Sequence, residues 1–418
     1  MTTNTISPQD RVFSDVDISS NAFWAKPFDE RESSFAELRH RGGVSWHPAV
    51  EVSFPHAEPG FWAITRAEHI NQISLDHEAF ITDPGVNVEP IPYALSKSLT
   101  FFLQMDKPEH TLLRSLVSAA FTPKQILKIQ DQIFANAAEI VDGVIGAGEI
   151  DFVGRVAGVL PMRTVSDMVG VSPTEREAVA IAAERLIGRS DSATGNPADV
   201  LQGMIDARDF LHSVGSSLAA HRRSNPGDDL MTNLVEARID GVGLTDDQIG
   251  SFMVLFAVAG NDTTKQTTSR TVYSLDRNRD QRQWLLEDFD GRIGVAIEEF
   301  VRHGSPVIGF ARTATRDYEL EGQTIRRGDK VVLFYCSGNR DEQRFADASR
   351  FILSRKPNRH FGFGGGGVHF CLGNGVAKTQ LKALFGELLR KAPDIEVGEP
   401  EALVSRSING VKRLPVRI

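Results

Sequence analysis

The sequence has few cysteines, no long apolar run and no excess of basic charge. Only Cys336 and Cys371 occur among 418 residues, which is too few for a disulfide framework and typical of a reducing compartment. Lys and Arg number 46 against 55 Asp and Glu, a net charge of −9, and no basic stripe follows a predicted helix, so we expect no nucleic-acid partner. The longest apolar run, 252–260, is about half of the ~18 residues that a membrane span needs, so we expect no membrane insertion.

Targeting signals and internal divisions are also lacking. Residues 1–20 carry acidic side chains where a secretory signal would need a basic segment and then an apolar run, so we expect no export and a cytoplasmic protein. The composition, 41% hydrophobic and 24% charged, is that of a globular protein. No repeat, low-complexity tract or linker interrupts the chain, which predicts a single domain over residues 1–418.

Helix signals dominate from about residue 108 to residue 392. Thr122-Pro123 predicts a helix start, with the helix running to about Val144, and Ser172-Pro173 predicts another start. The turn sequence Asn225-Pro-Gly-Asp ends a further helix, and residues 374–391 have helical apolar spacing. Most of the chain is therefore predicted to be helical.

One helix should be unusually long and central. Thr245 and Gln248 have the spacing of a capping box, and helical character continues to about Leu275, roughly 45 Å at 1.5 Å per residue. Strand signals are confined to residues 60–65 and 318–335, and Cys336 directly follows the second of these segments, so we expect it in a buried strand. The predicted fold class is mainly α with a small β region.

A glycine-rich loop delivers the second cysteine to a predicted helix start. The segment His360-Phe-Gly-Phe-Gly-Gly-Gly-Gly-Val-His-Phe-Cys371 precedes the helix of residues 374–391. Backbone N–H groups and the helix dipole favour a thiolate there, and a thiolate is a strong metal ligand. The loop also matches a dinucleotide fingerprint, but a polar stretch replaces the buried strand that this motif requires. A buried structural cysteine remains the other alternative.

Polar residues interrupt the long helix after an apolar stretch. Ala259-Gly-Asn-Asp262-Thr263-Thr264 places an acid and hydroxyls where helix propensity and burial both oppose them, and such conflicts often mark function. We expect a local opening at Gly260, with Thr263 turned back towards a main-chain carbonyl. A helix that simply emerges into solvent is the other interpretation.

Three further patterns carry weak signals by themselves. His110 and Arg114 are four residues apart on one predicted helix face, suited to binding an anionic group, and Arg312 is a candidate third donor. Glu299 and Arg302 are three apart and can pair. Each of these residues could equally lie on an ordinary solvated surface.

Taken in order along the chain, these motifs resemble the cytochrome P450 family of heme-thiolate monooxygenases. The resemblance extends from Pro108-Glu-His-Thr-x-x-Arg114 through Asn339-Arg-Asp341 to Gly410-Val-Lys-Arg-Leu-Pro-Val. It implies a triangular, helix-rich fold with heme b between the long central helix and the cysteine-bearing loop. It also implies the axial thiolate ligand Cys371 and the propionate-binding residues His110, Arg114, Arg312 and His369.

The resemblance also implies roles within the long helix and its neighbour. Asp262 and Thr263 match the acid–alcohol pair that manages proton delivery during dioxygen activation, and Glu299 with Arg302 matches a structural ion pair. One departure is that Phe363 stands eight residues before Cys371, where the family usually has seven, because of an extra glycine. That departure leaves the loop geometry open.

The same resemblance implies the reaction and its partners. The motifs are closest to an actinobacterial branch that hydroxylates methyl-branched lipids, isoprenoids and sterols, with electrons from a ferredoxin and its reductase. By analogy, a largely apolar substrate pocket is formed by residues 85–102, 180–210, 305–310 and 407–411 and the helix around Phe256, including Phe101, Phe102, Val307, Ile308 and Phe310. A peroxide-driven heme enzyme and a heme sensor or carrier are the alternatives.

Overall fold

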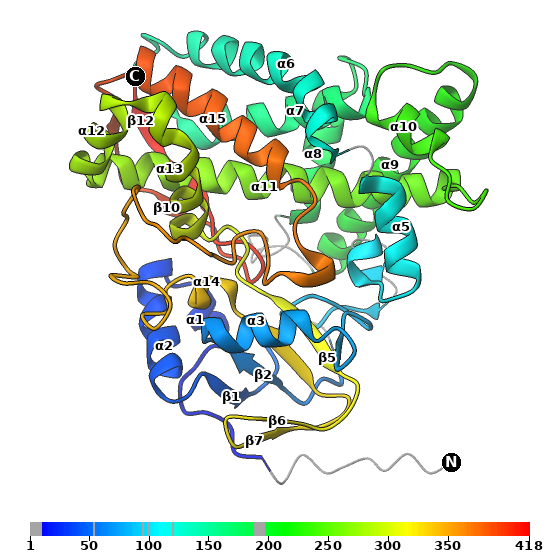
Figure 1. Cartoon of the computed structure of the whole chain (residues 1–418), viewed down its shortest axis with the longest axis vertical. Coiled ribbons are helices and arrows are strands. Elements are labelled where there is room, and N and C mark those ends of the chain that lie inside the picture. The colour runs from blue at the N-terminus through cyan, green and yellow to red at the C-terminus, as the bar shows by residue number, and fades with distance from the viewer. Residues whose placement is uncertain (1–10, 53–54, 94–95, 98–100, 119–120, 188–196) are drawn as a thin grey trace.

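The structure describes residues 11–52, 55–93, 96–97, 101–118, 121–187 and 197–418. In this computed structural model, a broad helical part narrows towards a smaller part built around a sheet (Figure 1). The outline is therefore triangular. The predicted fold class, mainly α with a small β region, is confirmed.

The helices differ greatly in length. Their bounds are α1 Asn21–Trp24, α2 Phe28–His40, α3 Ala67–Leu75, η2 Phe101–Gln104, α5 Glu109–Ser118, α6 Pro123–Asp142, η4 Val153–Ala157, α7 Val159–Val169, α8 Arg176–Ile187, α9 Pro197–Ser224, α10 Leu230–Glu236, α11 Asp246–Arg277, α12 Arg279–Glu287, α13 Phe289–Gly304, α14 Tyr335–Gly338, η6 Gly367–His369 and α15 Asn374–Lys391. Helices α1, α2, α3 and α14 lie beside the sheet in the smaller part, and the long helices α6, α9, α11 and α15 lie in the broad part (Figure 1).

The strands are short and form small sheets. Their bounds are β1 Val44–His47, β2 Phe61–Ile64, β3 Phe80–Ile81, β4 Glu149–Asp151, β5 Phe310–Ala314, β6 Tyr318–Leu320, β7 Gln323–Ile325, β8 Lys330–Leu333, β9 Glu396–Val397, β10 Glu401–Ala402, β11 Val411–Arg413 and β12 Pro415–Arg417. The main sheet has the order β1-β2-β8-β5-β3, in which β2 and β8 are parallel and the other pairs are antiparallel. The smaller sheets are β4-β12-β9, β10-β11 and β6-β7.

The long helix α11 crosses the helical part (Figure 1). Its predicted capping box is present, because the Gln248 N–H donates to Thr245 Oγ1 at 3.1 Å and the Thr245 N–H donates to Gln248 Oε1 at 2.9 Å. Helices α7, α8, α9, α13 and α15 all pack against it. The expectation of a long central helix is confirmed.

Several helix boundaries agree with the structure, but the confinement of strands to residues 60–65 and 318–335 is wrong, because β1, β3, β4, β5 and β9 to β12 lie outside those segments. Thr122 caps α6, and α15 has the predicted bounds. However, Ser172-Pro173 forms a turn, in which the Glu175 N–H donates to the Ser172 carbonyl at 3.0 Å, and α8 begins only at Arg176. The prediction of a strand at Cys336 is wrong: the chain leaves β8 at Leu333, and Cys336 lies in the short helix α14, still buried.

Candidate functional site

The glycine-rich loop delivers Cys371 to the start of α15, as the sequence predicts. The loop lies against α3, where a side chain on Gly365 would lie 2.0 Å from Ser74 Oγ, and the Gly365 carbonyl accepts from Asn71 Nδ2 at 2.9 Å. Gly366 has a φ of +94°, a backbone conformation that favours glycine. The Cys371 N–H donates to the Phe363 carbonyl at 2.9 Å, so the loop closes on itself despite the extra glycine.

Two opposing influences act on the Cys371 sulfur. Burial raises the pKa of the thiol, while the backbone N–H groups of Gly373 and Asn374 and the charge of Arg114 lower it. Burial dominates, so the pKa of the free thiol lies above its ordinary value, in contrast to the sequence-based expectation of a favoured thiolate. A metal ion bound to the sulfur would remove the proton, because coordination deprotonates a thiol.

Two histidines, His110 beside this loop and His369 within it, have unpartnered ring nitrogens among the described residues. His110 in α5 is 1% exposed, and its ring centroid lies 4.3 Å from that of His369 in η6. Neither Nδ1 nor Nε2 of His110, nor Nδ1 of His369, has a hydrogen-bond partner among the described residues. Burial and neighbouring cations lower the pKa of His110 to about 4 and that of His369 to about 2, so both rings are neutral without an anion beside them.

The two predicted arginines belong to the same cluster. Arg114 Nη2 donates to the Phe370 carbonyl at 2.5 Å, one residue before Cys371. Arg312 in β5 is 5% exposed, donates to the Ala311 carbonyl at 2.7 Å, and its charge helps to lower the pKa of His369. The structure therefore brings His110, Arg114, Arg312 and His369 together beside the cysteine-bearing loop.

These residues fit the heme that the resemblance implies. A heme needs one axial ligand and donors for two carboxylates, and carboxylates prefer charge-assisted donors such as Arg and protonated or neutral His. The unpartnered ring nitrogens of His110 and His369 are buried donors of this kind. Among the described residues no group of three or more His, Cys, Asp or Glu could hold a metal ion.

The polar interruption of α11 contains a buried ion pair that the sequence reasoning missed. Asp262 is 2% exposed, and its Oδ1 lies 2.8 Å from Lys265 Nζ, while its Oδ2 is buried without a partner among the described residues. Burial opposes the charge of Lys265, but the Asp262 carboxylate outweighs it and raises the pKa of Lys265. Glu184 of α8 lies 3.8 Å from the same ammonium group. The three-residue spacing from Asp262 to Lys265 was a usable signal for this pair.

Thr263 adopts the predicted orientation, but the helix does not open. Its hydroxyl donates to the Ala259 carbonyl at 2.9 Å, the back-bond that Thr makes within helices. The backbone stays α-helical from Asp246 to Arg277, so the expected opening at Gly260 is wrong. Glycine is required there because a side chain on Gly260 would lie 2.9 Å from Cγ2 of Val165 in α7.

The Glu299–Arg302 pair in α13 is fully buried, which excludes the solvated-surface interpretation. Their side chains are 0% exposed and 2.7 Å apart. Arg302 also donates to three backbone carbonyls, those of Asn339, Ala348 and Arg350. The pair joins α13 to the segment that leads to the cysteine-bearing loop.

Apolar side chains predicted to form the pocket divide into two groups. Phe102 of η2 stacks on Phe252 of α11 at 6.4 Å between ring centroids, and Phe252 stacks on Phe256 at 5.5 Å. Phe102 also lies 6.1 Å from the His110 ring, so this aromatic row links the basic cluster to α11. Ile308 instead is 0% exposed and packs in the core with α1, α2 and the sheet. Predicted pocket residues 94–95, 98–100 and 188–196 lie outside the described residues.

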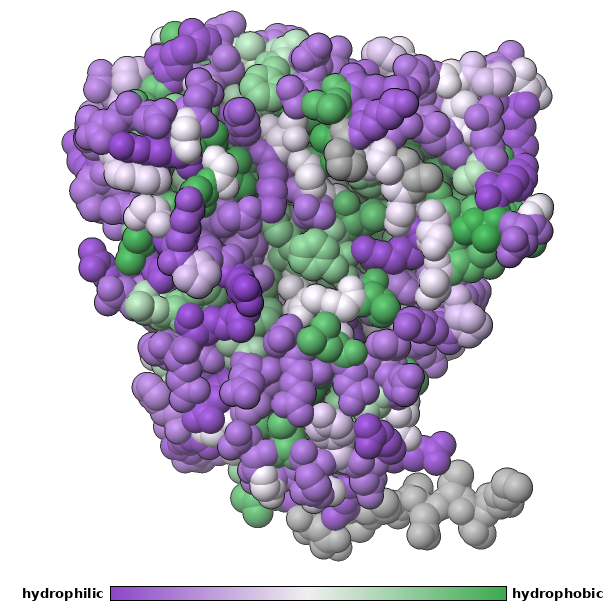
Figure 2. Space-filling view, in the orientation of Figure 1, coloured by the Kyte–Doolittle hydropathy of each residue, from purple (hydrophilic) through white to green (hydrophobic). Residues whose placement is uncertain are grey.

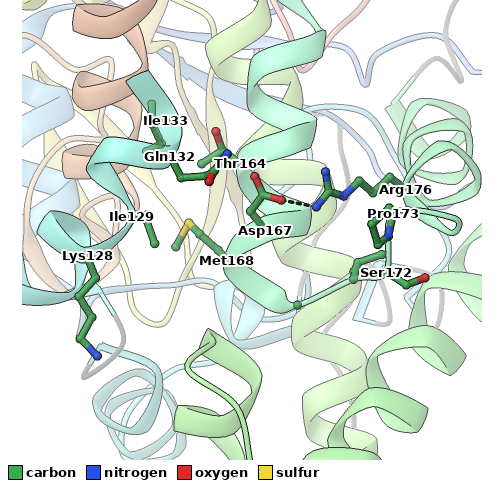
Figure 3. Close-up of a pocket in the computed structure, with 12 residues that line it drawn as sticks. Lys128, Ile129, Gln132, Ile133, Thr164, Asp167, Met168, Ser172, Pro173 and Arg176 are labelled. Atoms are coloured by element: carbon green, nitrogen blue, oxygen red, sulfur yellow. Dashed lines mark hydrogen bonds and ion pairs between the residues drawn. The ribbon is translucent and has the colours of Figure 1, made fainter. Parts of the chain in front are cut away.

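A surface pocket of about 490 Å³ lies away from the Cys371 loop and from the aromatic row of Phe102, Phe252 and Phe256. It is lined by α6, the end of α7 and the turn before α8, and it includes an ion pair between Asp167 and Arg176 (Figure 3). None of the predicted site residues lines it. Its lining mixes polar side chains such as Gln132 and Asp167 with apolar ones such as Ile129 and Met168.

The face shown in Figure 2 is mostly hydrophilic, with hydrophobic residues gathered near its middle, between the helical part and the sheet. None of the helices in the described ranges has the length and apolar character needed to cross a membrane.

Comparison with known proteins places this geometry in a family. The Cytochrome P450 family model matches residues 193–392. A methyl-branched lipid omega-hydroxylase of Mycobacterium tuberculosis is 37% identical over 99% of this chain and 97% of that protein. A steroid C26-monooxygenase of Mycolicibacterium smegmatis is 33% identical over 91% and 89%. A solved cytochrome P450 of Mycobacterium marinum in complex with pseudoionone is 48% identical, with a TM-score of 0.93 over 98% of this chain and 100% of that one. The chain belongs to the cytochrome P450 family of heme-thiolate monooxygenases.

Proposed function

We propose that this monooxygenase hydroxylates an unactivated C–H bond in a methyl-branched or isoprenoid hydrocarbon chain, with Cys371 as the iron ligand. The observation that carries the residue assignment is the cluster of unpartnered buried donors beside the Cys371 loop, His110 and His369. We assign the heme propionates to these two histidines together with Arg114 and Arg312. The alternative cysteine, Cys336, lies in α14, and burial raises the pKa of its thiol to about 12.

A heme held by Cys371 would supply the dioxygen chemistry, in which two electrons and two protons are consumed, one oxygen atom enters the substrate as a hydroxyl and the other leaves as water. The chain must deliver those protons. Asp262 is suited to this because its Oδ2 is buried and unpartnered while its Oδ1 is held by Lys265 at 2.8 Å. The Thr263 hydroxyl, bonded to Ala259, is the neighbouring donor that orients the delivery.

The substrate class rests on apolar burial and on the relatives. Phe102, Phe252 and Phe256 offer a stacked aromatic wall beside α11. At about 25 cal/mol per Å², covering roughly 300 Å² of apolar area contributes on the order of 7 kcal/mol of favourable free energy to the binding of a hydrocarbon chain. The relatives are named for methyl-branched lipid and steroid hydroxylation, and the M. marinum structure contains pseudoionone. Arg406, the cation beside the last pocket segment, already donates to Asn21 and to the Glu51 carbonyl.

We further propose a ferredoxin and its reductase as the electron source, in the cytoplasm. Both cysteines are unpaired thiols, which fits a reducing compartment. Two cysteines are too few to hold an iron–sulfur cluster within these 418 residues, which favours a separate protein as the electron source. Phe370 of the Cys371 loop is 41% exposed, and Lys378 of α15, which pairs with Glu298 at 2.7 Å, is partly exposed beside that loop; we assign this face to contact with an acidic ferredoxin.

A turnover experiment separates the reaction classes. The heme-loaded protein is supplied with a methyl-branched fatty acid and either ferredoxin, reductase and NAD(P)H or hydrogen peroxide alone. We expect hydroxylated product with the ferredoxin system and little with peroxide. Product with peroxide alone would identify a peroxygenase, and product in neither arm, with several chain substrates, would identify a sensor or carrier.

A binding experiment tests the substrate class separately. A methyl-branched fatty acid and its terpenoid-alcohol analogue are titrated against a benzoate, with the shift in heme absorbance as the signal. We expect at least tenfold tighter binding of the branched chains, because they bury more apolar area. Tighter binding of the benzoate would contradict the hydrocarbon assignment while leaving the reaction class intact.

A further inference from the structure

Three arginines from distant parts of the chain converge on one aromatic ring. Arg31 lies in α2, Arg270 in α11, and Arg340 two residues after α14. Their Cζ atoms lie 5.9, 5.0 and 5.6 Å, respectively, from the centroid of the Phe28 ring. Arg31 Cζ is also 5.4 Å from the Trp24 ring. We call these three guanidinium groups the arginine cluster.

The donors of the arginine cluster are buried and incompletely bonded. Arg31 is 3% exposed and Arg340 4%. Across the described ranges, no acceptor reaches the Nε atoms of Arg31 and Arg270, Nη1 of Arg340, or the indole N–H of Trp24. The hydrogen bonds that Arg270 and Arg340 do make go to neutral oxygens, Oδ1 of Asn409 at 3.5 Å and the His303 carbonyl at 2.8 Å.

The carboxylates near the arginine cluster are occupied elsewhere. Glu32 pairs with Arg39 at 2.7 Å, although its second oxygen is unpartnered, and Glu299 pairs with Arg302 at 2.7 Å. Asp29 is exposed on the surface of α2. The described ion pairs therefore include none formed by Arg31, Arg270 or Arg340. Glu32 and Asp29 act on Arg340 and Arg270 only from beyond ion-pair distance, so the three cations lie near one ring without an anion in direct contact.

Electrostatics of the neighbouring groups agree with this imbalance. Burial and the repulsion of other arginines lower the pKa of Arg31 to about 10 and that of Arg340 to about 9, so both stay charged at neutral pH. The Cys336 thiol beside them supplies no negative charge, because burial raises its pKa to about 12. Contact with the Phe28 ring compensates a buried cation only in part.

We propose that the arginine cluster, together with the Trp24 indole, binds a chloride ion between α2, α11 and the segment after α14. A compact monovalent anion satisfies several N–H donors from different directions and offsets part of the surplus charge. The site uses none of the residues assigned to heme, proton delivery or the apolar pocket. It would fasten α2 and the sheet-bearing part of the molecule to the central helix α11.

Thermal unfolding of the heme-loaded protein at constant ionic strength tests this site. Sodium gluconate is replaced stepwise by sodium chloride, and the unfolding midpoint is followed by heme absorbance and by circular dichroism. We expect a saturable rise of the midpoint with chloride, because a ligand that binds only the folded state stabilises it. An equal midpoint in both salts, or a rise with sulfate but not with chloride, would overturn the proposal.

Variants locate the effect. Arg31→Met and Arg270→Met should each abolish the chloride-dependent rise. Arg282→Met is the matched control, because Arg282 is a partly buried arginine that donates to the Ala392 and Pro393 carbonyls outside the cluster, and it should keep the full rise. A chloride-dependent rise that persists in Arg31→Met would place the anion elsewhere.

A crystallographic measurement on the unaltered holoenzyme does not depend on whether the variants fold. Crystals grown in sodium bromide are measured at the bromine absorption edge. We expect one buried anomalous peak within about 3.5 Å of Arg31 and Trp24 nitrogens, since bromide replaces chloride at such sites. Water alone at that position would overturn the proposal.

Discussion

Two buried polar clusters in this protein differ in whether their hydrogen-bonding groups have partners. Around Glu299 the carboxylate accepts from Arg302, Arg355 and the Ile352 N–H, and the pair is sealed from solvent. Around His110 the ring nitrogens are equally buried but have no partner within the described residues. Because a buried polar group without a partner is costly, the Glu299 carboxylate needs no ligand, whereas the ring nitrogens of His110 are placed to bind one.

The largest effect should follow from breaking the cluster around Glu299. Glu299→Gln removes the charge that compensates Arg302 and Arg355, and we expect it to lower the free energy of unfolding by about 3–5 kcal/mol, measured by urea denaturation. Glu287→Gln is the control: its partner is Arg292, its side chain is 53% exposed, and we expect a loss below about 1 kcal/mol. If both variants lost the same free energy of unfolding, the buried Glu299–Arg302 pair would contribute no more to stability than an exposed pair.

A buried histidine outside both clusters sharpens the comparison. His47 is 0% exposed, its Nδ1 is unpartnered among the described residues, and burial lowers its pKa to about 4. The unfolded chain binds a proton near pH 6.5 while the folded one does not, so the stabilisation is complete above that pH and is lost as the pH falls towards 4. We expect His47→Gln to flatten the acid-induced loss of stability by up to about 3 kcal/mol between pH 7 and pH 4. Parallel pH profiles for variant and wild type would contradict this prediction.

A substitution in the cluster around His110 should weaken heme binding and leave the stability of the fold largely unchanged. Arg312→Met removes a buried donor assigned to a propionate, and a charged hydrogen bond contributes about 1.5–3 kcal/mol, so we expect heme to dissociate at least tenfold faster. Transfer of heme to apomyoglobin measures this rate. The control Arg316→Met changes an arginine that is 63% exposed, and it should leave the rate unchanged.

A smaller effect is expected from a substitution in α11, which should change the yield of product but not the binding of heme or substrate. Thr263→Ala should keep heme and substrate affinity but divert electrons to hydrogen peroxide, lowering the product formed per NAD(P)H severalfold. The matched control is Thr267→Ala, which removes the same type of bond one turn further along, from Thr267 to the Thr263 carbonyl at 2.8 Å. Unchanged coupling in Thr263→Ala would move the role to Asp262 or Thr264.

Local signals in the sequence explain which parts of the fold were predictable. The capping box at Thr245 and the apolar spacing of residues 374–391 fixed two helices, because both signals act within a few residues. The Cys336 prediction failed because the apolar run of β8 continues past Leu333 although the backbone turns into α14. The predicted opening at Gly260 was wrong because the glycine serves close packing against Val165, which lies on another helix and cannot be inferred from the local sequence. The single domain over residues 1–418 stays a prediction.

The candidate site was predictable only through the family resemblance. His110 and Arg114 share a helix face, but nothing in the spacing of the chain brings them to His369 or Arg312, which lie some 200 residues or more away. The arginine cluster was missed for the same reason, since Arg31, Arg270 and Arg340 meet only in the folded protein. Lys265 could have been found, because it is three residues from Asp262 on one helix.

The heme spectra of the two cysteine variants test the central claim most directly. Cys371→Ser and Cys336→Ser are each purified, reduced and exposed to carbon monoxide, and the heme absorbance is compared with that of the wild type. The account predicts that Cys371→Ser loses the thiolate-type spectrum while Cys336→Ser keeps it, because only Cys371 lies beside the unpartnered donors of His110 and His369. A thiolate spectrum that survives in Cys371→Ser and disappears in Cys336→Ser would contradict it.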